Sequence, residues 1–185
     1  DSRVGPRAAG IPGVVAGFAY AHEKWGTKPW KELVEPAIAL ARNGHTLDDW
    51  HAKDIKYAAK KMHEYGYDDS AAIFERSPGE PYEAGDTWKQ PDLAKTLKRI
   101  QKEGKDGFYR GKTAKLLARF MKKHGGIITE EDLAKYEAVE QKPIHGTYRG
   151  YDIYAMSPPS SGGVDMVEML NILEGFNLKE MGHNS

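Results

Sequence analysis

The sequence predicts an α+β chain that is mainly α-helical and carries one small β-hairpin. Three segments, 47–65, 91–104 and 112–124, repeat apolar residues at helical spacing over long stretches. One short segment, 143–156, instead alternates aromatic and β-branched residues with polar ones. Helix should therefore exceed strand by at least roughly threefold, with the strands concentrated in 143–156.

The first helical segments are expected between Pro12 and Gly44. Pro12 suits the first turn of a helix that ends at Gly26. The apolar stripe of this helix consists of Val14, Val15, Phe18, Ala19 and His22. Segment 30–44 continues the helical period, but Pro36 removes a backbone donor inside it, which favours two short helices over one.

The middle of the chain alternates between helices and a long irregular stretch. Segment 47–65 mixes apolar residues with many charges and predicts an amphipathic helix that stops at Gly66. Closely spaced Gly, Pro and Asp residues make 66–90 a predicted loop, with one helical turn at the apolar residues 71–74.

Strong start and stop signals follow in the next part of the chain. Helices are expected over 91–104 and 112–124, each ending at glycine, with the turn 106–111 between them. Thr129 then precedes three acidic residues, which is typical of an N-cap followed by a first turn that complements the helix dipole.

The composition excludes several kinds of site and partner. Lys plus Arg equals Asp plus Glu at 27 each, so the total charge favours neither nucleic acid nor an anionic membrane. Without cysteine there is no disulfide framework and no thiol nucleophile, and zinc would need His and carboxylate ligands. Residues 1–7 lack an initiator Met and a signal-peptide core, so we interpret the 185 residues as an excised or processed segment.

The most informative segment runs from 151 to 163. A strand ends at Pro158 and Pro159, and a helix expected to be buried over 164–173 begins after Ser160, Ser161, Gly162 and Gly163. Such a junction can line a ligand pocket, because glycine permits close backbone approach. A helix N-terminus capped by serine is the alternative, and the residue types alone favour this structural interpretation.

Other residues that can carry chemistry form weaker patterns. The seven histidines lack the spacing of a metal site. The pairs His51–Glu64 and His63–Asp68 are candidate acid–base pairs, although charged residues on a solvated helix are usually surface residues. No G-x-S-x-G motif surrounds Ser160 or Ser161, so neither is an evident nucleophile.

The segment 107–111 resembles a small anion-binding loop. Glycines, an arginine and a following helix N-terminus coincide there. No strand precedes it and it lacks the phosphate-loop pattern, so two aromatic residues packed in a turn between helices are the simpler interpretation.

Several motifs, taken together and in order, resemble the gamma-glutamyltransferase (gamma-glutamyltranspeptidase) family. They span nearly the whole chain, and their succession is more specific than any one of them. The motifs are GIPGVVAG at 10–17, WGTKPW at 25–30, EPAIALARNG at 35–44, QPDLAKTL at 90–97, FYRG at 108–111, GGIITEEDL at 125–133, YRGY at 148–151, MSPPSSGG at 156–163 and LNILE at 170–174.

The resemblance implies an N-terminal nucleophile hydrolase, whose precursor cleaves itself into a large and a small subunit. Residues 1–185 match a single segment of the large subunit, which would contribute to a four-layer αββα sandwich. The new N-terminal Thr of the small subunit attacks the γ-glutamyl amide, with its own α-amino group as base. Glutathione is the implied donor, and water, an amino acid or a peptide is the acceptor.

The resemblance places the nucleophile outside this chain, so no catalytic residue is assigned. The family's substrate-binding arginine belongs to an Arg-Glu motif that neither Arg3 nor Arg7 shows. The substrate-binding candidates are Ser160, Ser161, Gly162 and Gly163, as cleft lining or as a structural turn. No cofactor, metal or nucleic acid is implied, and the family leads us to expect a periplasmic or secreted protein.

Two alternatives to a glutathione-cleaving enzyme stay open. One is a related acylase or poly-γ-glutamate processing enzyme on the same scaffold, and the other is a non-catalytic helical interaction module. In each enzyme the partner of this segment is the small subunit of the same precursor. Without that partner the hairpin leaves an exposed strand edge and an uncovered apolar face, which favours self-association.

Overall fold

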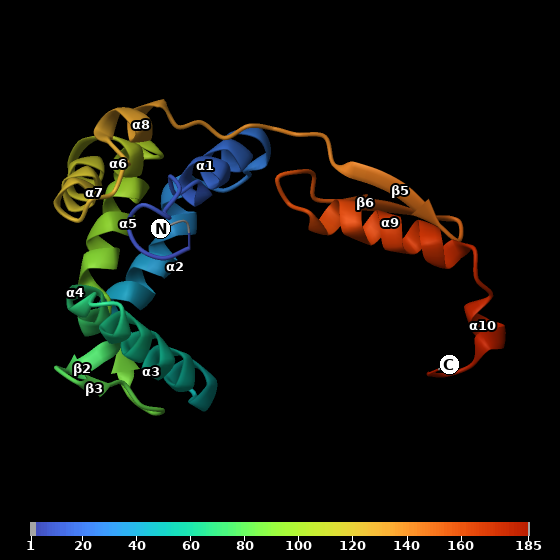
Figure 1. Ribbon diagram of the computed structural model, residues 1–185. Helices are drawn as coiled ribbons and strands as arrows, with labels where there is room; N and C mark the ends of the chain where they lie inside the picture. The colour runs from blue at the N-terminus through green and yellow to red at the C-terminus, as the bar shows by residue number, and fades with distance from the viewer. Residues whose placement is uncertain (1–2, 185) are drawn as a thin grey trace. The chain divides into compact units, whose positions relative to one another are not determined.

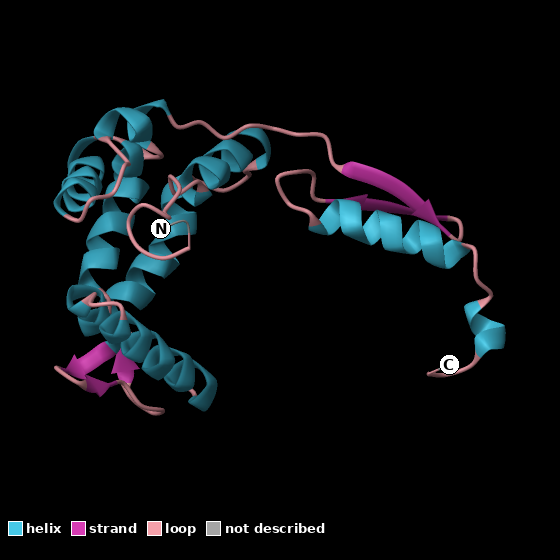
Figure 2. Ribbon diagram, in the orientation of Figure 1, coloured by secondary structure: helices cyan, strands magenta, loops and turns pink. Residues whose placement is uncertain are grey.

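The computed structural model describes residues 3–184 and is mainly helical (Figures 1 and 2). The chain divides into two compact units, Asp1–Ala138 and Val139–Ser185. Helical residues outnumber strand residues by well over the predicted ratio, which confirms the mainly helical α+β class. Among the described helices, none is both long and apolar enough to cross a membrane.

The first unit contains five longer helices, several single turns and two small strand pairs. The longer helices are α1 (Val14–Trp25), α2 (Trp30–Asn43), α3 (Asp49–Glu64), α5 (Pro91–Glu103) and α7 (Gly111–Lys123). The shorter helices are α4 (Asp68–Ala71), η1 (Ala72–Phe74), α6 (Asp106–Tyr109) and α8 (Glu130–Lys135). The antiparallel pairs are β1 (His45–Thr46) with β4 (Thr87–Trp88), and β2 (Glu75–Ser77) with β3 (Glu80–Pro81).

Segment 30–44 forms the single helix α2, so the prediction of two short helices is wrong. Pro36 lies inside it and removes one donor, but the carbonyl that loses this partner belongs to the exposed Glu32 and can be hydrated. Packing against α5 (Figure 1) offsets the loss, and the Trp30 indole donates to the Ile100 carbonyl at 2.9 Å. Tertiary contacts therefore override the local effect of the proline.

The helix α1 begins later, and faces the core differently, than the sequence predicted. Pro12 precedes its first turn, and Val14 and Phe18 are each 65% exposed, so their assignment to the packed stripe is wrong. Ala16 is buried instead. The reason is that the buried Tyr109 hydroxyl accepts the Ala16 N–H at 3.1 Å, which turns the face of α1 that carries the small Ala16 side chain toward the core.

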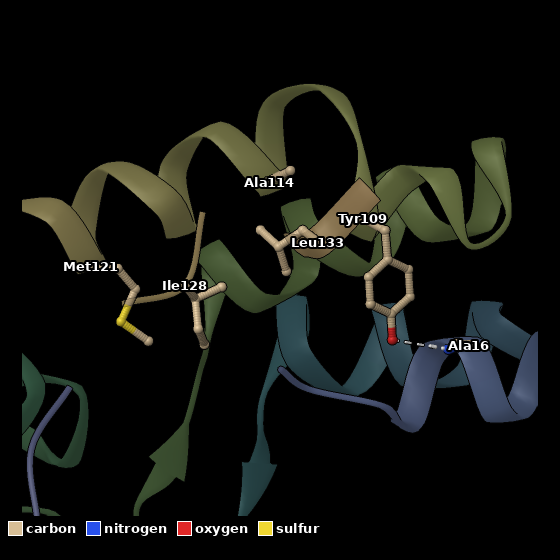
Figure 3. Close-up of a cluster of buried hydrophobic side chains, with 6 residues drawn as sticks. All are labelled: Ala16, Tyr109, Ala114, Met121, Ile128 and Leu133. Atoms are coloured by element: carbon tan, nitrogen blue, oxygen red, sulfur yellow. Dashed lines mark hydrogen bonds between the residues drawn. The ribbon is translucent and has the colours of Figure 1, made fainter. Parts of the chain in front are cut away.

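Two apolar clusters hold the first unit together. One joins α1, α6, α7 and α8 and consists of Ala16, Tyr109, Ala114, Met121, Ile128 and Leu133 (Figure 3). The other lies under α3 and consists of Leu47, Ala52 and Ile55, with Phe74, Tyr82 and Trp88 packed against it.

The second cluster explains why segment 66–90 is more ordered than the predicted loop. Trp88 packs into the cluster, and its indole donates to the Ile73 carbonyl at 3.0 Å. The chain around it forms the short strands β2, β3 and β4, which the sequence did not predict. The predicted helical turn at 71–74 is confirmed.

The predicted helices over 47–65, 91–104 and 112–124 are confirmed as α3, α5 and α7. Thr129 caps α8 as predicted, in a reciprocal capping box with Asp132. The Thr129 side chain accepts the Asp132 N–H at 3.1 Å, and the Asp132 carboxylate accepts the Thr129 N–H at 2.9 Å. The Thr129 hydroxyl also donates to this carboxylate. The two hydrogen bonds that the Asp132 carboxylate accepts, from the Thr129 hydroxyl and then from the Thr129 N–H, lower the pKa of Asp132.

Replacing Thr129 with alanine should lower the free energy of unfolding by about 1 kcal/mol, because the hydroxyl satisfies a helix N–H that otherwise lacks a partner. Thr129→Ser keeps the hydroxyl and should retain most of that stability. Urea unfolding of both variants tests this, and equal losses in the two would show that the cap contributes nothing.

The second unit is a hairpin covered by one helix. β5 (Ile144–Tyr148) and β6 (Tyr151–Ala155) pair around Arg149 and Gly150, whose φ angles of 49° and 84° suit a two-residue hairpin turn. The predicted hairpin is therefore confirmed. α9 (Gly162–Glu174) packs on it and is followed by the short α10 (Leu178–Met181).

The predicted burial of segment 164–173 is wrong, although the helix exists. Val164, Met169 and Ile172 are 42%, 57% and 59% exposed. A two-stranded hairpin covers only one side of α9, and within residues 3–184 β5 and β6 pair only with each other. The unit thus presents an exposed apolar helix face and two unpaired strand edges, as the sequence analysis expected of the hairpin.

Candidate functional site

The junction between β6 and α9 is a compact turn. The Ser160 amide donates to the Ser157 carbonyl at 3.3 Å, and the Ser157 hydroxyl donates to the Gln141 side chain at 2.8 Å. The Pro158–Pro159 peptide bond is cis. The turn brings the chain back so that α9 starts directly against the end of β6.

Gly163 lies at the closest point of this return. It is buried, and a Cβ atom there would lie 2.1 Å from the Met156 carbonyl oxygen and 3.1 Å from the Ala155 Cβ. Gly162 differs, because a Cβ atom there would meet only the Ser160 hydroxyl, at 3.6 Å. The close backbone approach predicted for this glycine pair therefore occurs at Gly163.

The two serines do not cap α9, so the predicted serine cap is wrong. Ser161 is the N-cap residue, but its φ and ψ of −75° and −25° are helical, whereas a capping side chain needs extended backbone. Its carbonyl accepts the Asp165 N–H at 2.9 Å, and its hydroxyl makes no capping bond. Ser160 and Ser161 are both exposed, and within the described residues their hydroxyls have no hydrogen-bond partner.

Removing either hydroxyl should therefore change the stability very little. We expect Ser160→Ala and Ser161→Ala to alter the free energy of unfolding by less than about 0.5 kcal/mol, which is the usual range for exposed positions. Thermal unfolding of the two variants beside the parent measures this. A loss of about 1 kcal/mol or more would indicate a cap that the structure does not contain.

The segment 107–111 packs as a core element and does not form an anion-binding loop. Tyr109 is buried, and its hydroxyl donates to the Pro12 carbonyl at 2.6 Å. The same hydroxyl accepts the Ala16 N–H, the bond drawn as a dashed line in Figure 3. Burial raises the pKa of this phenol. Phe108 packs edge-to-face on it at 5.0 Å, which confirms the interpretation as packed aromatics.

Tyr109 is the residue that sequence reasoning missed. It fixes the glycine-rich segment 10–17, and Tyr136 stacks on its ring at 5.4 Å. A Cβ atom at Gly13 would lie 2.2 Å from the Tyr136 hydroxyl, so a larger residue there would have to displace the Tyr136 ring. The contacts span more than ninety residues, and no local pattern could have shown them.

The two candidate acid–base pairs behave differently. His51 contacts Asp48 at 2.8 Å, and in the described part of the chain it makes no hydrogen bond to Glu64, so that pair is not formed. His63 does contact Asp68, with 2.7 Å between Nδ1 and the carboxylate, but its Nε2 lies 2.6 Å from Glu75. Both ring nitrogens are therefore occupied, and the ring has no free nitrogen for a substrate. Among residues 3–184, no group of three or more side chains has the geometry of a metal site.

The contacts of His63 make the stability of the first unit depend on pH. The hydrogen bond to Glu75, followed by that to Asp68, raises the pKa of His63 above 6.5, and the bond to His63 lowers the pKa of Glu75 below 4.5. The His63 contribution is complete below pH 6.5 and is lost as the pH rises through the folded pKa. The Glu75 contribution is present above pH 4.5 and is lost as the pH falls.

We therefore expect the stability difference between the parent and His63→Gln to be largest between pH 4.5 and 6.5 and to shrink at alkaline pH. Urea unfolding across this range measures it. His51→Gln is the matched control, because His51 also contacts an aspartate but, within residues 3–184, has no second carboxylate partner. An unchanged difference from pH 5 to pH 9 would contradict a charged His63.

The chain belongs to the gamma-glutamyltranspeptidase family, because the family model for gamma-glutamyltranspeptidase matches residues 1–185. It is 49% identical over 179 residues to the glutathione hydrolase proenzyme of Escherichia coli K12, covering 96% of this chain and 30% of that protein. It is 41% identical over 177 residues to the capsule biosynthesis protein CapD proenzyme of Bacillus anthracis, covering 95% and 31%. The resemblance inferred from the motifs is thereby confirmed.

Solved structures agree with this assignment. The chain matches Helicobacter pylori gamma-glutamyltranspeptidase with a TM-score of 0.94 at 43% identity, over 100% of this chain and 52% of that one. It matches a cephalosporin acylase of Bacillus halodurans with a TM-score of 0.82 at 31% identity, over 94% and 33%. The chain spans about a third of the length of its curated relatives.

Proposed function

We propose that this chain is part of the large subunit of a glutathione hydrolase or gamma-glutamyltransferase. The observation that carries the proposal is the 49% identity to a glutathione hydrolase proenzyme over 96% of the chain. The family match spans residues 1–185, so it includes the glycine-rich segment held by Tyr109 and the junction at Gly163.

The proposed reaction is γ-glutamyl transfer through a covalent enzyme intermediate. The N-terminal Thr of the small subunit, exposed by self-cleavage of the precursor, attacks the γ-carbonyl carbon of glutathione. Its α-amino group takes the hydroxyl proton, which then passes to the leaving amine as the amide bond breaks. Water, an amino acid or a peptide next attacks the γ-glutamyl ester and regenerates the threonine.

In this proposal the second unit is the part that meets the small subunit. Its exposed apolar helix face and unpaired strands are the surfaces that a neighbouring sheet and helix would cover in an αββα sandwich. Covering them should suppress the self-association expected of the isolated chain. The family resemblance also supports a periplasmic or secreted location for the intact protein.

The junction at 160–163 has two proposed roles. Gly163 allows the close contact between α9 and β6, and is structural. The exposed hydroxyls of Ser160 and Ser161 are available to contact substrate in the intact enzyme. Gly162 exposes its backbone beside them at the N-terminus of α9, where amide donors have no partner within the helix.

A second candidate function rests on two further relatives. CapD at 41% identity and the acylase ACY 1 proenzyme of Pseudomonas sp. strain SE83 at 37% identity match this chain over nearly all of its length. The same segment therefore occurs in proteins with other names. Poly-γ-glutamate processing and acylase activity are the alternatives that an assay must separate from glutathione hydrolysis.

The test uses the intact, self-processed protein that carries this chain and three substrates. These are a γ-glutamyl anilide, an acylated β-lactam and poly-γ-glutamate. We expect the γ-glutamyl anilide to give the highest kcat/KM. A higher kcat/KM for the β-lactam or the polymer would replace the proposal by the corresponding alternative, and no turnover of any of the three would favour a non-catalytic module.

A further inference from the structure

The chain has no net charge in total, but one region of it is strongly basic. Between residues 93 and 124 the Lys and Arg residues number eleven, whereas Asp and Glu number two. The remainder of the chain is correspondingly acidic. Within this region, α7 contains five Lys or Arg residues and no Asp or Glu. The total charge is therefore a poor guide to the partners of this helix.

The cations of α7 lie on one side of the helix. At 100° of rotation per residue, all five cations fall within an arc of about 100° around the helix axis. These residues, called the basic face of α7 below, are Lys112, Lys115, Arg119, Lys122 and Lys123. All five are exposed, and within residues 3–184 none forms an ion pair.

The other side of α7 is occupied by the protein's own core. Thr113, Ala114 and Met121 are buried, and Leu117 packs against the same cluster. The cations therefore point outward from a helix that is fixed in place. Neighbouring like charges repel one another and destabilise the helix slightly, and an anionic partner would relieve this repulsion.

Exposed apolar side chains flank the basic face on both sides. Leu116 and Phe120, on α7 itself, are 49% and 42% exposed. Ile127, in the segment after α7, is 58% exposed and lines an open hollow of about 770 Å³ together with Lys115, Arg119 and Lys122. A row of cations flanked by apolar side chains offers both electrostatic attraction to anionic lipids and apolar area that can be buried among the headgroups.

We propose that the basic face of α7 binds the surface of an anionic phospholipid bilayer. A planar bilayer can contact the outermost side of α7. There the charged ends of the Lys and Arg side chains reach the headgroups while their aliphatic stems lie along the protein. A thread-like polyanion would instead have to lie in the hollow, whose lining also includes Glu130 and Glu131. Their negative charges disfavour that occupant. The inference goes beyond the proposed enzymatic function and does not depend on it.

The test measures binding of the intact protein that carries this chain to sedimented vesicles. Vesicles of phosphatidylcholine with phosphatidylglycerol are compared with vesicles of phosphatidylcholine alone. We expect binding to the anionic vesicles only, and release when salt rises from about 0.1 M to about 1 M, because the Debye length falls from about 10 Å to about 3 Å.

The residues are tested with two triple variants that remove the same charge. Lys115→Ala, Arg119→Ala and Lys122→Ala together should lower the partition coefficient at least about tenfold. The matched control is Lys53→Ala, Lys56→Ala and Lys60→Ala on α3, whose lysines are exposed among the acidic residues Asp49, Asp54 and Glu64. It should change the partition coefficient by less than about twofold. Circular dichroism of both variants verifies that the fold is retained.

Several results would overturn the proposal. These are no binding to anionic vesicles, equal binding to neutral ones, and equal losses in the two triple variants. Soluble poly-glutamate or duplex DNA is the competitor. If either polymer displaced the protein from vesicles at an equal concentration of negative charge, the face would be a site for soluble polyanions and the membrane assignment would be wrong.

Discussion

Replacing Gly163 with valine should lower self-cleavage and turnover of the intact protein by at least about tenfold. A Cβ atom at this position would lie 2.1 Å from the Met156 carbonyl oxygen, well inside the contact distance, so backbone must move. The neighbouring Ala155 Cβ, 3.1 Å away, blocks a small adjustment in its direction. Overpacking of this kind costs roughly 1–3 kcal/mol or more, and here it separates α9 from the end of β6.

The matched control for this prediction is Gly162→Ala, one residue earlier in the same helix. A Cβ atom at Gly162 meets only the Ser160 hydroxyl at an ordinary contact distance of 3.6 Å. Alanine also suits a helix better than glycine by roughly 0.5–1 kcal/mol, so this variant should be at least as stable as the parent and should cleave itself equally well. Self-cleavage is followed by the appearance of the two subunits on a gel, and turnover by release from a γ-glutamyl anilide. Equal behaviour of the two variants would refute a special role for Gly163.

The sequence was sufficient where local physics decides the structure. The helices over 47–65, 91–104 and 112–124 follow from apolar periodicity, and Thr129 marks its helix because the hydroxyl and Asp132 satisfy each other's donors within four residues. The turn at Arg149 and Gly150 was predictable for the same reason, since its geometry involves only adjacent residues.

The errors occur where distant contacts decide the structure. Pro36 is tolerated because α2 packs on α5, and Phe18 faces outward because Tyr109, more than ninety residues away, holds the backbone at Ala16. Trp88 orders a stretch that has the composition of a loop. None of these partners can be recognised from spacing along the chain.

The candidate site was predicted in part. Close approach at Gly163 followed from the residue type, but the serine cap did not form, because Ser161 has a helical backbone that a sequence does not show. The apolar composition of 164–173 indicated a buried helix, yet its exposed side needs a covering layer that the described residues do not supply. The apolar composition of 164–173 thus indicates a helix that is suited to being covered on both sides, and the proposed small subunit is the partner that would cover its exposed side.

The 185-residue chain alone is expected to release no product from a γ-glutamyl amide above a heat-killed control. The proposed mechanism needs one threonine whose hydroxyl attacks and whose free α-amino group serves as base. Three threonines of this chain have structural roles instead. Thr113 is buried and donates to the Gly107 carbonyl at 2.7 Å, Thr129 caps α8, and Thr96 bonds the Asp92 carbonyl at 3.0 Å.

The intact protein is the control for this experiment, and it should both cleave itself and turn over the amide. Changing its cleavage-site threonine to alanine should abolish both activities together, because the proposal assigns the nucleophilic hydroxyl of both reactions to this residue. Thr129→Ala in the intact protein removes a hydroxyl of the same kind from a structural position, so it should lower stability by about 1 kcal/mol and leave both activities measurable. Product release by the purified 185-residue chain, or turnover that survives loss of the cleavage-site threonine, would show that the nucleophile lies elsewhere and that the proposed division of labour between the two subunits is wrong.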